Sequence, residues 1–483
     1  MDIITLLQDY ASELLSAELD FTEHPDKFSD FEHRVASASQ KTAADFLAMA
    51  LTQMNQEICD SGLRRKDYNI LKHDQRTIIT TVGDVTYRHT LFSRKEDGAR
   101  CYLLDDMMHW PANEKFSEQA EAKVLYEAEA HSYQHAADAL QIGAQKISKV
   151  TVMNKVHGIA EELPPDREVD DNSKKSCKYL YIEADEDHIH LQKNTNGKTG
   201  VIGKLVYLFE GKEDVCTGKR KLISLHYLGG LYPGSDANAS LWKSVQKYIE
   251  DHYNTDEIKT VYISGDGGSW IKAGTEYVDR SVFVADKFHL MKYISKAARY
   301  TLDEEANTKE EFYRHIREDD LKAALKLLTA IRECNEESEG AVEDYSKFFV
   351  NNWDAIQRAF NDSNVLGCSA ESHVSNVYSD RMSSRPMGWS EVGSDHMCRL
   401  RCYVRNYGAE KIVDLVQYRR EKAFEKREVL ATGTDGIIEP AKPKKRYSKA
   451  QKEVQKYFEA MQATIGGYTV RKTLAIRQRI NEI

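Results

Sequence analysis

The stretch between Cys177 and Leu302 constrains the fold most, because short apolar strands and amphipathic helices alternate along it. KYLYIEAD is rich in β-branched and aromatic residues, HIHLQ alternates apolar with polar residues, and KLVYLFEG and KLISLHYLG predict two further strands. ASLWKSVQKYIEDHY predicts an amphipathic helix, IKTVYISGDGG a buried strand, and SVFVADKFHLMKYISKAARYTL a strand followed by a helix. The predicted order is three strands, helix, strand, helix, strand and helix.

This order is typical of a ribonuclease H-like α/β fold. The segment after it is wholly helical and highly charged, and polar chemistry resumes in ESHVSNVYSDRMSSRPMGWSEVGSDHM, so we interpret the helices as an insertion within the α/β domain. A chain of 483 residues also has room for about three domains. The predicted regions are an N-terminal helical and β-hairpin region (1–110), a helix-turn-helix region (111–163), a first part of the catalytic core (176–302), an all-α insertion (303–365), a second part of the core (366–425) and a basic helical tail (426–483).

The charge distribution leaves room for a nucleic-acid partner although the net charge is -10. From Arg401 to the end there are 19 Lys and Arg against 10 Asp and Glu, so basic residues concentrate in this segment. Phosphate contacts need such local clusters rather than a basic total, although a solvated basic helix would have the same composition. No apolar run approaches the roughly 20 residues of a membrane span, and MDIITLLQDYASELL lacks a basic leader. We therefore expect a cytoplasmic, nucleoid-associated protein.

Two segments before the α/β region could contact DNA. RTIITTVGDVTYRHTLF predicts a β-hairpin around the turn Gly83-Asp84. HSYQHAADALQIGAQKISKVTVMNKVHGI has the rhythm of a helix-turn-helix, with a turn at Ile142 and Gly143. Its second helix could enter the major groove. The residues that it would present to bases or phosphates are Lys149, Thr151, Asn154 and Lys155. A helical hairpin that only packs is the alternative.

Three acidic residues could form a metal site. Asp185 ends the first predicted strand and Asp266 ends the fourth, and these strands are neighbours in a ribonuclease H-like sheet. The third ligand should follow the helical insertion, and Glu371 in SAESHVSNVYSDR is favoured over Glu391, whose surroundings are loop-like. Magnesium is held by a few carboxylates plus substrate phosphate, so the set predicts two Mg²⁺ (or Mn²⁺) ions for phosphoryl transfer. An Asp after a strand can equally be an ordinary turn or helix-cap residue.

Further residues could assist such a site. Asp286 and His289 form a D-x-x-H after the fifth strand and could orient a metal ligand or contact a phosphate, or could be a helix-capping pair. Arg381 and Arg385 could clamp DNA phosphates. Trp270 or Trp389 could stack on an unpaired base, but buried packing is the commoner role of a tryptophan. Eight cysteines are scattered without zinc-ribbon spacing, and the closest pair, Cys398 and Cys402 with His396, lacks further ligands in range.

Four passages together are similar to the ISLre family of bacterial insertion-sequence transposases, which is related to the Mutator-like clade. They are YIEADEDHIHLQ, YISGDGGSWIKAG, VADKFHLMKYI and ESHVSNVYSDRMSSRPMGWSEVGSDHMCRLR. The resemblance implies a DDE-type ribonuclease H-like domain with an all-α insertion, Asp185, Asp266 and Glu371 as its triad, and Asp286 with His289 as the accessory motif. One departure is Glu186, where the family commonly has glycine after the first acid.

These observations predict a DNA transposase that binds terminal inverted repeats and uses Mg²⁺ for strand cleavage and strand transfer. Double-stranded DNA is the expected partner, and a homo-oligomer is expected because two transposon ends must be held together. One alternative is a catalytically inactive, transposase-derived DNA-binding regulator, which would bind the repeats without nicking them. Another is a structure-selective nuclease that cuts branched DNA and joins nothing.

Overall fold

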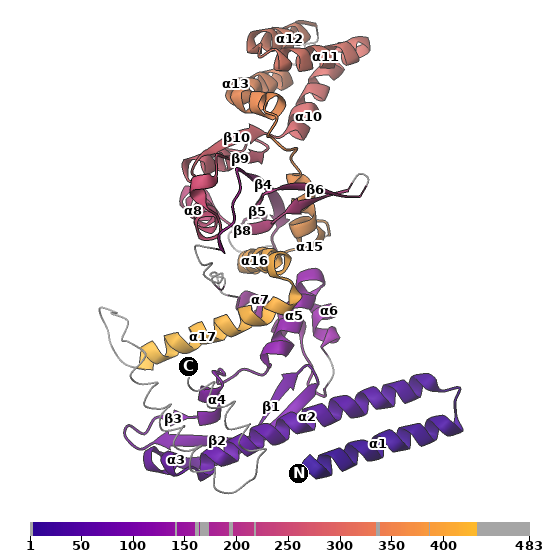
Figure 1. The fold of residues 1–483 in the computed structure, drawn as a ribbon, viewed down its shortest axis with the longest axis vertical. Helices are drawn as coiled ribbons and strands as arrows, with labels where there is room; N and C mark the ends of the chain where they lie inside the picture. Colours follow the sequence, from indigo (N-terminus) through magenta and orange to yellow (C-terminus); the bar gives the residue numbers. More distant parts are fainter. Residues whose placement is uncertain are drawn as a thin grey trace. The chain divides into compact units, whose positions relative to one another are not determined.

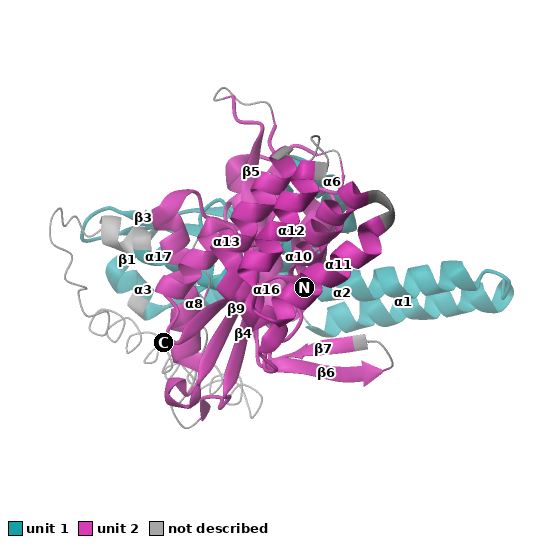
Figure 2. Cartoon of the chain, turned by 90° about the horizontal axis from the view of Figure 1, so that it is seen from above, with its two compact units in different colours: residues 1–125, 133–152, 413–483 teal, residues 126–132, 153–412 magenta. Residues whose placement is uncertain are grey.

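The computed structural model describes residues 3–140, 143–159, 164, 173–192, 197–216, 219–334, 339–385 and 387–431 (Figure 1). The chain divides into two compact units (Figure 2). Unit 1 comprises residues 1–125, 133–152 and 413–483, and unit 2 comprises residues 126–132 and 153–412. Most of the predicted basic tail, 432–483, and most of the residues between the predicted helix-turn-helix region and the catalytic core lie outside the described residues.

Unit 1 combines a long helical hairpin with a small antiparallel sheet of order β1-β2-β3. Ile78, Val85, Tyr87 and Leu104 form its core, with Trp110 beside them. The elements that lie within it are α1 (Ile3–Glu23), α2 (Phe28–Asp60), α3 (Gly62–Asp67), β1 (Tyr68–Thr80), β2 (Gly83–Arg94), β3 (Arg100–Cys101), α4 (Leu103–Met107) and α6 (Tyr133–Ala139). Three helices cross the boundary between the units: α5 (Glu118–Ala130), α7 (Lys149–His157) and α17 (Ile412–Ala431).

The predicted hairpin is present, but its turn lies earlier than expected. Thr80 pairs with Gly83, so Thr81 and Val82 form the turn and Gly83 already begins β2. Gly83 has a φ of 125°, a backbone conformation that favours glycine. The glycine therefore marks the start of the second strand rather than the centre of the turn.

Unit 2 is a mixed α/β structure around a five-stranded sheet of order β10-β9-β4-β5-β8. β4 pairs antiparallel with β5, and β5 antiparallel with β8, whereas β9 is parallel to β4 and β10 is parallel to β9. The strands and the helices among them are β4 (Tyr179–His190), β5 (Gly200–Phe209), β6 (Gly211–Cys216), β7 (Lys219–Ile223), β8 (His226–Leu231), α8 (Gly234–His252), β9 (Thr260–Gly265), α9 (Ser269–Lys272), β10 (Ser281–Ala285) and α10 (Lys287–Ala298).

Two strand predictions were wrong in their limits. The first strand does not end at Asp185 as predicted, because β4 runs continuously from Tyr179 to His190 against β5 and takes in the start of HIHLQ. KLISLHYLG is broken at Ser224, whose φ of 54° ends β7 before β8 begins. The residues before the break belong to a two-stranded arm, β6–β7, and those after it to the main sheet.

Helices pack on the sheet through regularly spaced apolar side chains. In α8, Leu241, Trp242, Val245 and Ile249 are buried at intervals of three and four residues, so one face of the helix lies in the core with Leu180, Ile182 and Ala184 of β4. The α-helical segment after α10 consists of α11 (Glu305–Arg317), α12 (Leu321–Cys334) and α13 (Glu339–Asn361). Its buried side chains, including Phe312, Leu328 and Phe349, join the same core.

The chain returns to the sheet through α14 (Ala370–Val374), a π-helical turn over Ser375–Ser379, α15 (Asp380–Met382) and α16 (Glu391–Tyr407). α14 contacts β4, and α16 contacts β8 and β5. One face of β4 alternates with its core residues and carries Tyr181, Glu183, Asp185 and Asp187. Glu183 accepts a hydrogen bond from Ser369 and Asp187 one from Ser383, so this face contacts the returning segment. Among the described helices, none has the length and apolar character needed to cross a membrane.

Candidate active site

Three aspartates occupy one level at the edge of the central sheet. β4 and β9 pair up to Glu183↔Ser264, and β9 and β10 pair up to Gly265↔Ala285. Continuing these two registers sets Asp185 opposite Asp266, and Asp266 opposite Asp286. Asp185 does not end β4 as predicted, because the strand continues against β5. It lies where the pairing with β9 has ended, which leaves this edge open for side chains.

Asp185 is the most perturbed of these acids. Its Oδ1 accepts a hydrogen bond of 2.9 Å from the backbone N–H of Glu186. Burial above all, together with the negative charge of Asp266, raises the pKa of Asp185 to about 6, although the hydrogen bond from Glu186 N–H and the nearby His289 act in the opposite direction. The negative charge on Asp185 is therefore unfavourable in this environment unless a cation accompanies it.

Asp266 is exposed and begins the turn after β9. Its Oδ1 accepts a hydrogen bond of 2.8 Å from Gly268 N–H, and Gly267 has a φ of 96°, which only glycine adopts readily. The DGG sequence therefore forms a turn, which is a common role of an aspartate after a strand. The same turn leaves Asp266 at the level of Asp185, so one residue serves both the turn and the acidic edge.

Asp286 has the helix-capping role that was one of the two considered for Asp286 and His289. Asp286 is the N-cap of α10, and its Oδ1 accepts a 2.9 Å hydrogen bond from Phe288 N–H. Its Oδ2 lies 3.9 Å from His289 Nε2. Burial raises the pKa of Asp286, and the charges of Glu371 and Asp266 raise it further. The capping carboxylate therefore belongs electrostatically to the acidic edge.

Glu371 is exposed on α14, and a buried network holds the start of that helix against the sheet. Glu183, on β4, is 2% exposed, and its Oε2 accepts hydrogen bonds from Ser369 N–H at 2.6 Å, Ser369 Oγ at 3.0 Å and the Tyr207 hydroxyl. Lys212 lies 3.7 Å from Glu183 Oε1 and donates to the carbonyl of Gly367. Glu371 therefore follows, by two residues, a backbone position fixed to the strand that carries Asp185.

His373 adds a second attachment for α14. Its Nδ1 lies 2.6 Å from the Tyr227 hydroxyl of β8, and its ring stacks on Tyr207 of β5 with centroids 4.3 Å apart. Burial lowers the pKa of His373 to about 4, so the ring is neutral near pH 7. Neither Glu183 nor His373 was predicted as functional, because a buried partner of a later helix gives no local signal in the sequence.

Glu391, the rival third acid, lies elsewhere. It is the first residue of α16 rather than part of a loop, since Ser390 caps the helix by accepting from Gly393 N–H at 3.0 Å. Trp389 N–H donates to the carbonyl of His190 at the far end of β4, and Glu391 is 3.3 Å from Lys198. Five residues of extended strand, roughly 16 Å, separate His190 from Asp185. Glu391 therefore lies away from Asp185, toward the opposite end of β4.

The acids at this edge have no Lys or Arg within ion-pair distance in the described part of the chain. The basic neighbour there is His289, whose Nε2 lies 3.9 Å from Asp286 Oδ2. Among the described residues, Asp185, Asp266 and Glu371 do not form a group in which all the ligand atoms lie within 4.8 Å of one another. Two ions about 3.5–4 Å apart do not need such a set, because different carboxylates can bind different ions. An uncompensated group of oxygen ligands fits hard divalent cations.

Glu186 replaces the glycine common in the resembling family and has its own partners. Its Oε2 accepts a 2.9 Å hydrogen bond from Trp270 Nε1. Lys204 Nζ lies 5.0 Å from the centroid of the Trp270 ring and donates to the carbonyl of Tyr232 at 2.9 Å. Trp270 is therefore engaged in packing and hydrogen bonding here, as is Trp389, which is buried and donates to Met382 O at 3.1 Å.

The predicted DNA contacts differ in accessibility. All four helix residues lie on α7, where Lys149 and Asn154 are exposed and Thr151 and Lys155 are half-buried. Arg385 is exposed. The prediction for Arg381 was wrong: it is 5% exposed, its Nε donates to Ala128 O at 3.1 Å, and its guanidinium stacks on Trp389. Burial of its donors in the protein removes them from any phosphate.

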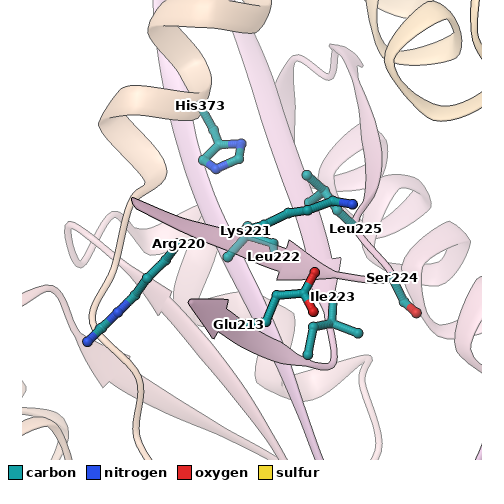
Figure 3. Close-up of a pocket in the computed structure, with 8 residues that line it drawn as sticks. All are labelled: Glu213, Arg220, Lys221, Leu222, Ile223, Ser224, Leu225 and His373. Atoms are coloured by element: carbon teal, nitrogen blue, oxygen red, sulfur yellow. The ribbon is translucent and has the colours of Figure 1, made fainter. Parts of the chain in front are cut away.

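An open cleft lies beside α14. Figure 3 shows His373 of α14 on one side and the β6–β7 arm on the other. The arm lines it with Glu213, Arg220 and Lys221, and Arg220 Nε is 3.1 Å from Asp214. The cleft therefore lies between the β6–β7 arm, which carries both charges, and α14, which also carries Glu371.

These features define a mixed α/β protein with an acidic edge on its central sheet. Residues 23–419 match the model of the uncharacterised protein family UPF0236, and the chain belongs to this family. One UPF0236 protein of Caldanaerobacter subterraneus subsp. tengcongensis is 31% identical over 402 residues, which cover 83% of this chain and 82% of the relative. A second from the same organism is 32% identical over 377 residues, covering 78% of each chain. The name of the first relative carries eleven locus designations from one genome.

Proposed function

We propose that this protein is a DNA transposase with a ribonuclease H-like catalytic domain, and that Asp185, Asp266 and Glu371 hold two divalent cations. The observation that carries the proposal is the shared level of Asp185 and Asp266 on neighbouring parallel strands. The hydrogen bond from Ser369, two residues before Glu371, to Glu183 of β4 supports the choice of the third acid. The strand order, with three antiparallel strands followed by two parallel ones, supports the ribonuclease H-like assignment. The multiple loci of one relative support a mobile element.

The arrangement of the acids suits phosphoryl transfer on DNA. When bound, two Mg²⁺ or Mn²⁺ ions would activate an attacking water or 3′-hydroxyl and stabilise the leaving oxygen. Asp185 offers a half-buried carboxylate whose position β4 fixes, while the exposed Asp266 and Glu371 leave the site open to a large substrate. Asp286 is held by its capping bond and by His289, and so can orient the neighbouring acids.

DNA recognition is assigned to surfaces outside this edge. Lys149, Thr151, Asn154 and Lys155 of α7 would contact the terminal inverted repeats, and Arg385 would contact phosphates near the site. The partner is double-stranded DNA, both transposon ends and target, and two ends held together require more than one copy of the chain. Concentrated positive charge in the C-terminal segment would add sequence-independent affinity.

The test is a cleavage and joining assay on DNA that carries the element's terminal repeats, with Mg²⁺ or Mn²⁺. Wild-type protein should nick and join these ends, and Asp185→Asn, Asp266→Asn and Glu371→Gln should each lose activity by roughly a thousandfold or more while still binding the repeats. Glu391→Gln is the matched control and should retain activity. Full activity of the Asp185 or Asp266 variant would overturn the mechanism.

The same assay separates the proposal from its rivals. Binding of the repeats without divalent-ion-dependent nicking by wild-type protein would indicate a regulator that has lost catalysis. Cutting of generic branched DNA without joining would indicate a nuclease. Inverted repeats and a short target duplication flanking the gene would support mobility independently of any assay.

A further inference from the structure

The first helix of unit 1 carries an apolar stripe that no described element covers. Its large side chains are unusually exposed: Ile4 is 65%, Leu7 56%, Leu15 59% and Leu19 67% exposed. With the exposed Ala11 they follow the spacing of three and four residues that places side chains on one face of a helix. A contiguous apolar stripe of this kind marks an interaction surface rather than an ordinary solvent-facing helix.

The stripe is separate from the face that holds α1 on α2. Leu6 and Ala17 are buried between the helices, and Phe21 stacks on Phe31 with centroids 4.8 Å apart. The Tyr10 hydroxyl lies 3.0 Å from Ser39 Oγ. Since these contacts already fix the helical hairpin, the stripe is not needed for folding α1 onto α2.

The charge of α1 restricts the partner. The helix contains five acidic residues and neither Lys nor Arg. Nucleic acid and the anionic surface of a membrane would both be repelled by such a helix. The remaining class of partner is a protein with an apolar surface, and the spacing of the stripe indicates which protein surface fits it.

We infer that the stripe binds the same stripe of a second copy of this chain, as an antiparallel helix pair. The stripe is nearly symmetric about Ala11, with Leu7 and Leu15 four residues to either side. In an antiparallel pair Ile4 lies opposite Leu19, Leu7 opposite Leu15, and Ala11 opposite Ala11, as a two-fold axis requires. The small Ala11 at the centre lets the two helices approach closely.

The size of the stripe sets the strength of the pair. Four large side chains at these exposures offer on the order of 100 Å² each. Two copies would then bury roughly 800 Å², which is below the standard interface size and typical of weak association. Gln8 and Glu18 lie along the same face, where their polar ends can reach water while their methylene groups cover apolar neighbours. We therefore expect a dimer of micromolar affinity that rising salt strengthens, because the acidic helices repel one another.

The test uses the full chain without DNA or metal, so it is independent of the proposed function. Sedimentation equilibrium between about 1 and 100 μM should show a monomer–dimer equilibrium, and Leu7→Asp with Leu15→Asp should weaken it at least about tenfold. Val215→Asp, which changes a 63% exposed apolar residue on the β6–β7 arm, is the matched control and should leave it unchanged. Circular dichroism checks that the variants keep their helices.

Cysteine cross-linking tests the orientation. Under mild oxidation Ala11→Cys should form a disulfide-linked dimer above the background of the native cysteines, whereas Glu13→Cys, on the other side of the helix, should not. Ile4→Cys should link to Leu19→Cys in a mixture of the two variants, but not to itself. A chain that stays monomeric at 100 μM, or a dimer that the two Asp substitutions do not weaken, would overturn the inference. Linkage of Ile4→Cys to itself would overturn the antiparallel arrangement.

Discussion

Replacing Asp185 by asparagine should stabilise unit 2 at neutral pH while removing the proposed catalytic function. The pKa of the Asp185 carboxyl is raised to about 6 from 3.8, first by burial and then by Asp266. Because the folded pKa lies above the unfolded one, the folded chain holds more protons than the unfolded chain between about pH 4 and 6. Stability is therefore lost as pH rises through this window. Asparagine has nearly the same shape and does not ionise.

The size of the effect follows from the shift. A difference of about two pKa units corresponds to about 3 kcal/mol, and partial access to water reduces this to about 1.5–3 kcal/mol above pH 6.5. Below pH 4 both side chains are neutral, so the difference should fall under about 0.5 kcal/mol.

Hydrogen exchange of β4 peptides in increasing urea, with divalent ions chelated, measures unit 2 separately from unit 1. Addition of Mn²⁺ should stabilise the wild-type protein and not the variant. The reasoning fails if Asp185→Asn is no more stable than wild type at pH 7.5, or if it is equally stabilised at pH 4.

Three further variants test other parts of the structure. Glu183→Gln should destabilise unit 2 by about 2–4 kcal/mol, because the half-buried Lys212 and the donors around Glu183 lose a charged partner, and it should weaken Mn²⁺ affinity. Glu213→Gln on the exposed arm is the control, and unchanged Mn²⁺ binding by Glu183→Gln would show that this network does not support the metal site. Arg381→Ala should lower the free energy of unfolding by about 2–4 kcal/mol without changing the salt dependence of DNA binding. A smaller slope of log K against log salt in this variant would indicate that Arg381 does contact a phosphate. Lys149→Ala with Lys155→Ala should weaken repeat binding and lower the slope of log K against log salt by up to about 1.8, whereas an unchanged slope would exclude phosphate contacts by α7.

Much of unit 2 could be predicted because its elements carry local signals. The apolar strand before Asp266 and the periodic helix around Trp242 are visible without any tertiary information. The limits of the strands were less accessible. Nothing local shows that β4 continues through Glu186 and Asp187, since an acidic run usually ends a strand and here β5 keeps the backbone paired.

The sequence pointed to the candidate acids of the site but not to the residues that hold them. Asp185, Asp266 and Glu371 stand out because carboxylates follow apolar segments. The residues that fix them do not stand out, because Glu183 resembles its acidic neighbours until Ser369, 186 positions later, donates to it. Arg381 was assigned to DNA because an arginine near a predicted acid suggests a phosphate clamp, and its burial against Ala128 depends on packing that no local pattern encodes.

The most direct test of the account is the number of Mn²⁺ ions bound by the full chain together with a DNA end, measured by electron paramagnetic resonance. The account predicts two ions per catalytic site in the wild-type protein, and a loss of at least one when Asp185, Asp266 or Glu371 is replaced by its amide. Binding that stays the same in all three variants would contradict the claim that these acids form the metal site.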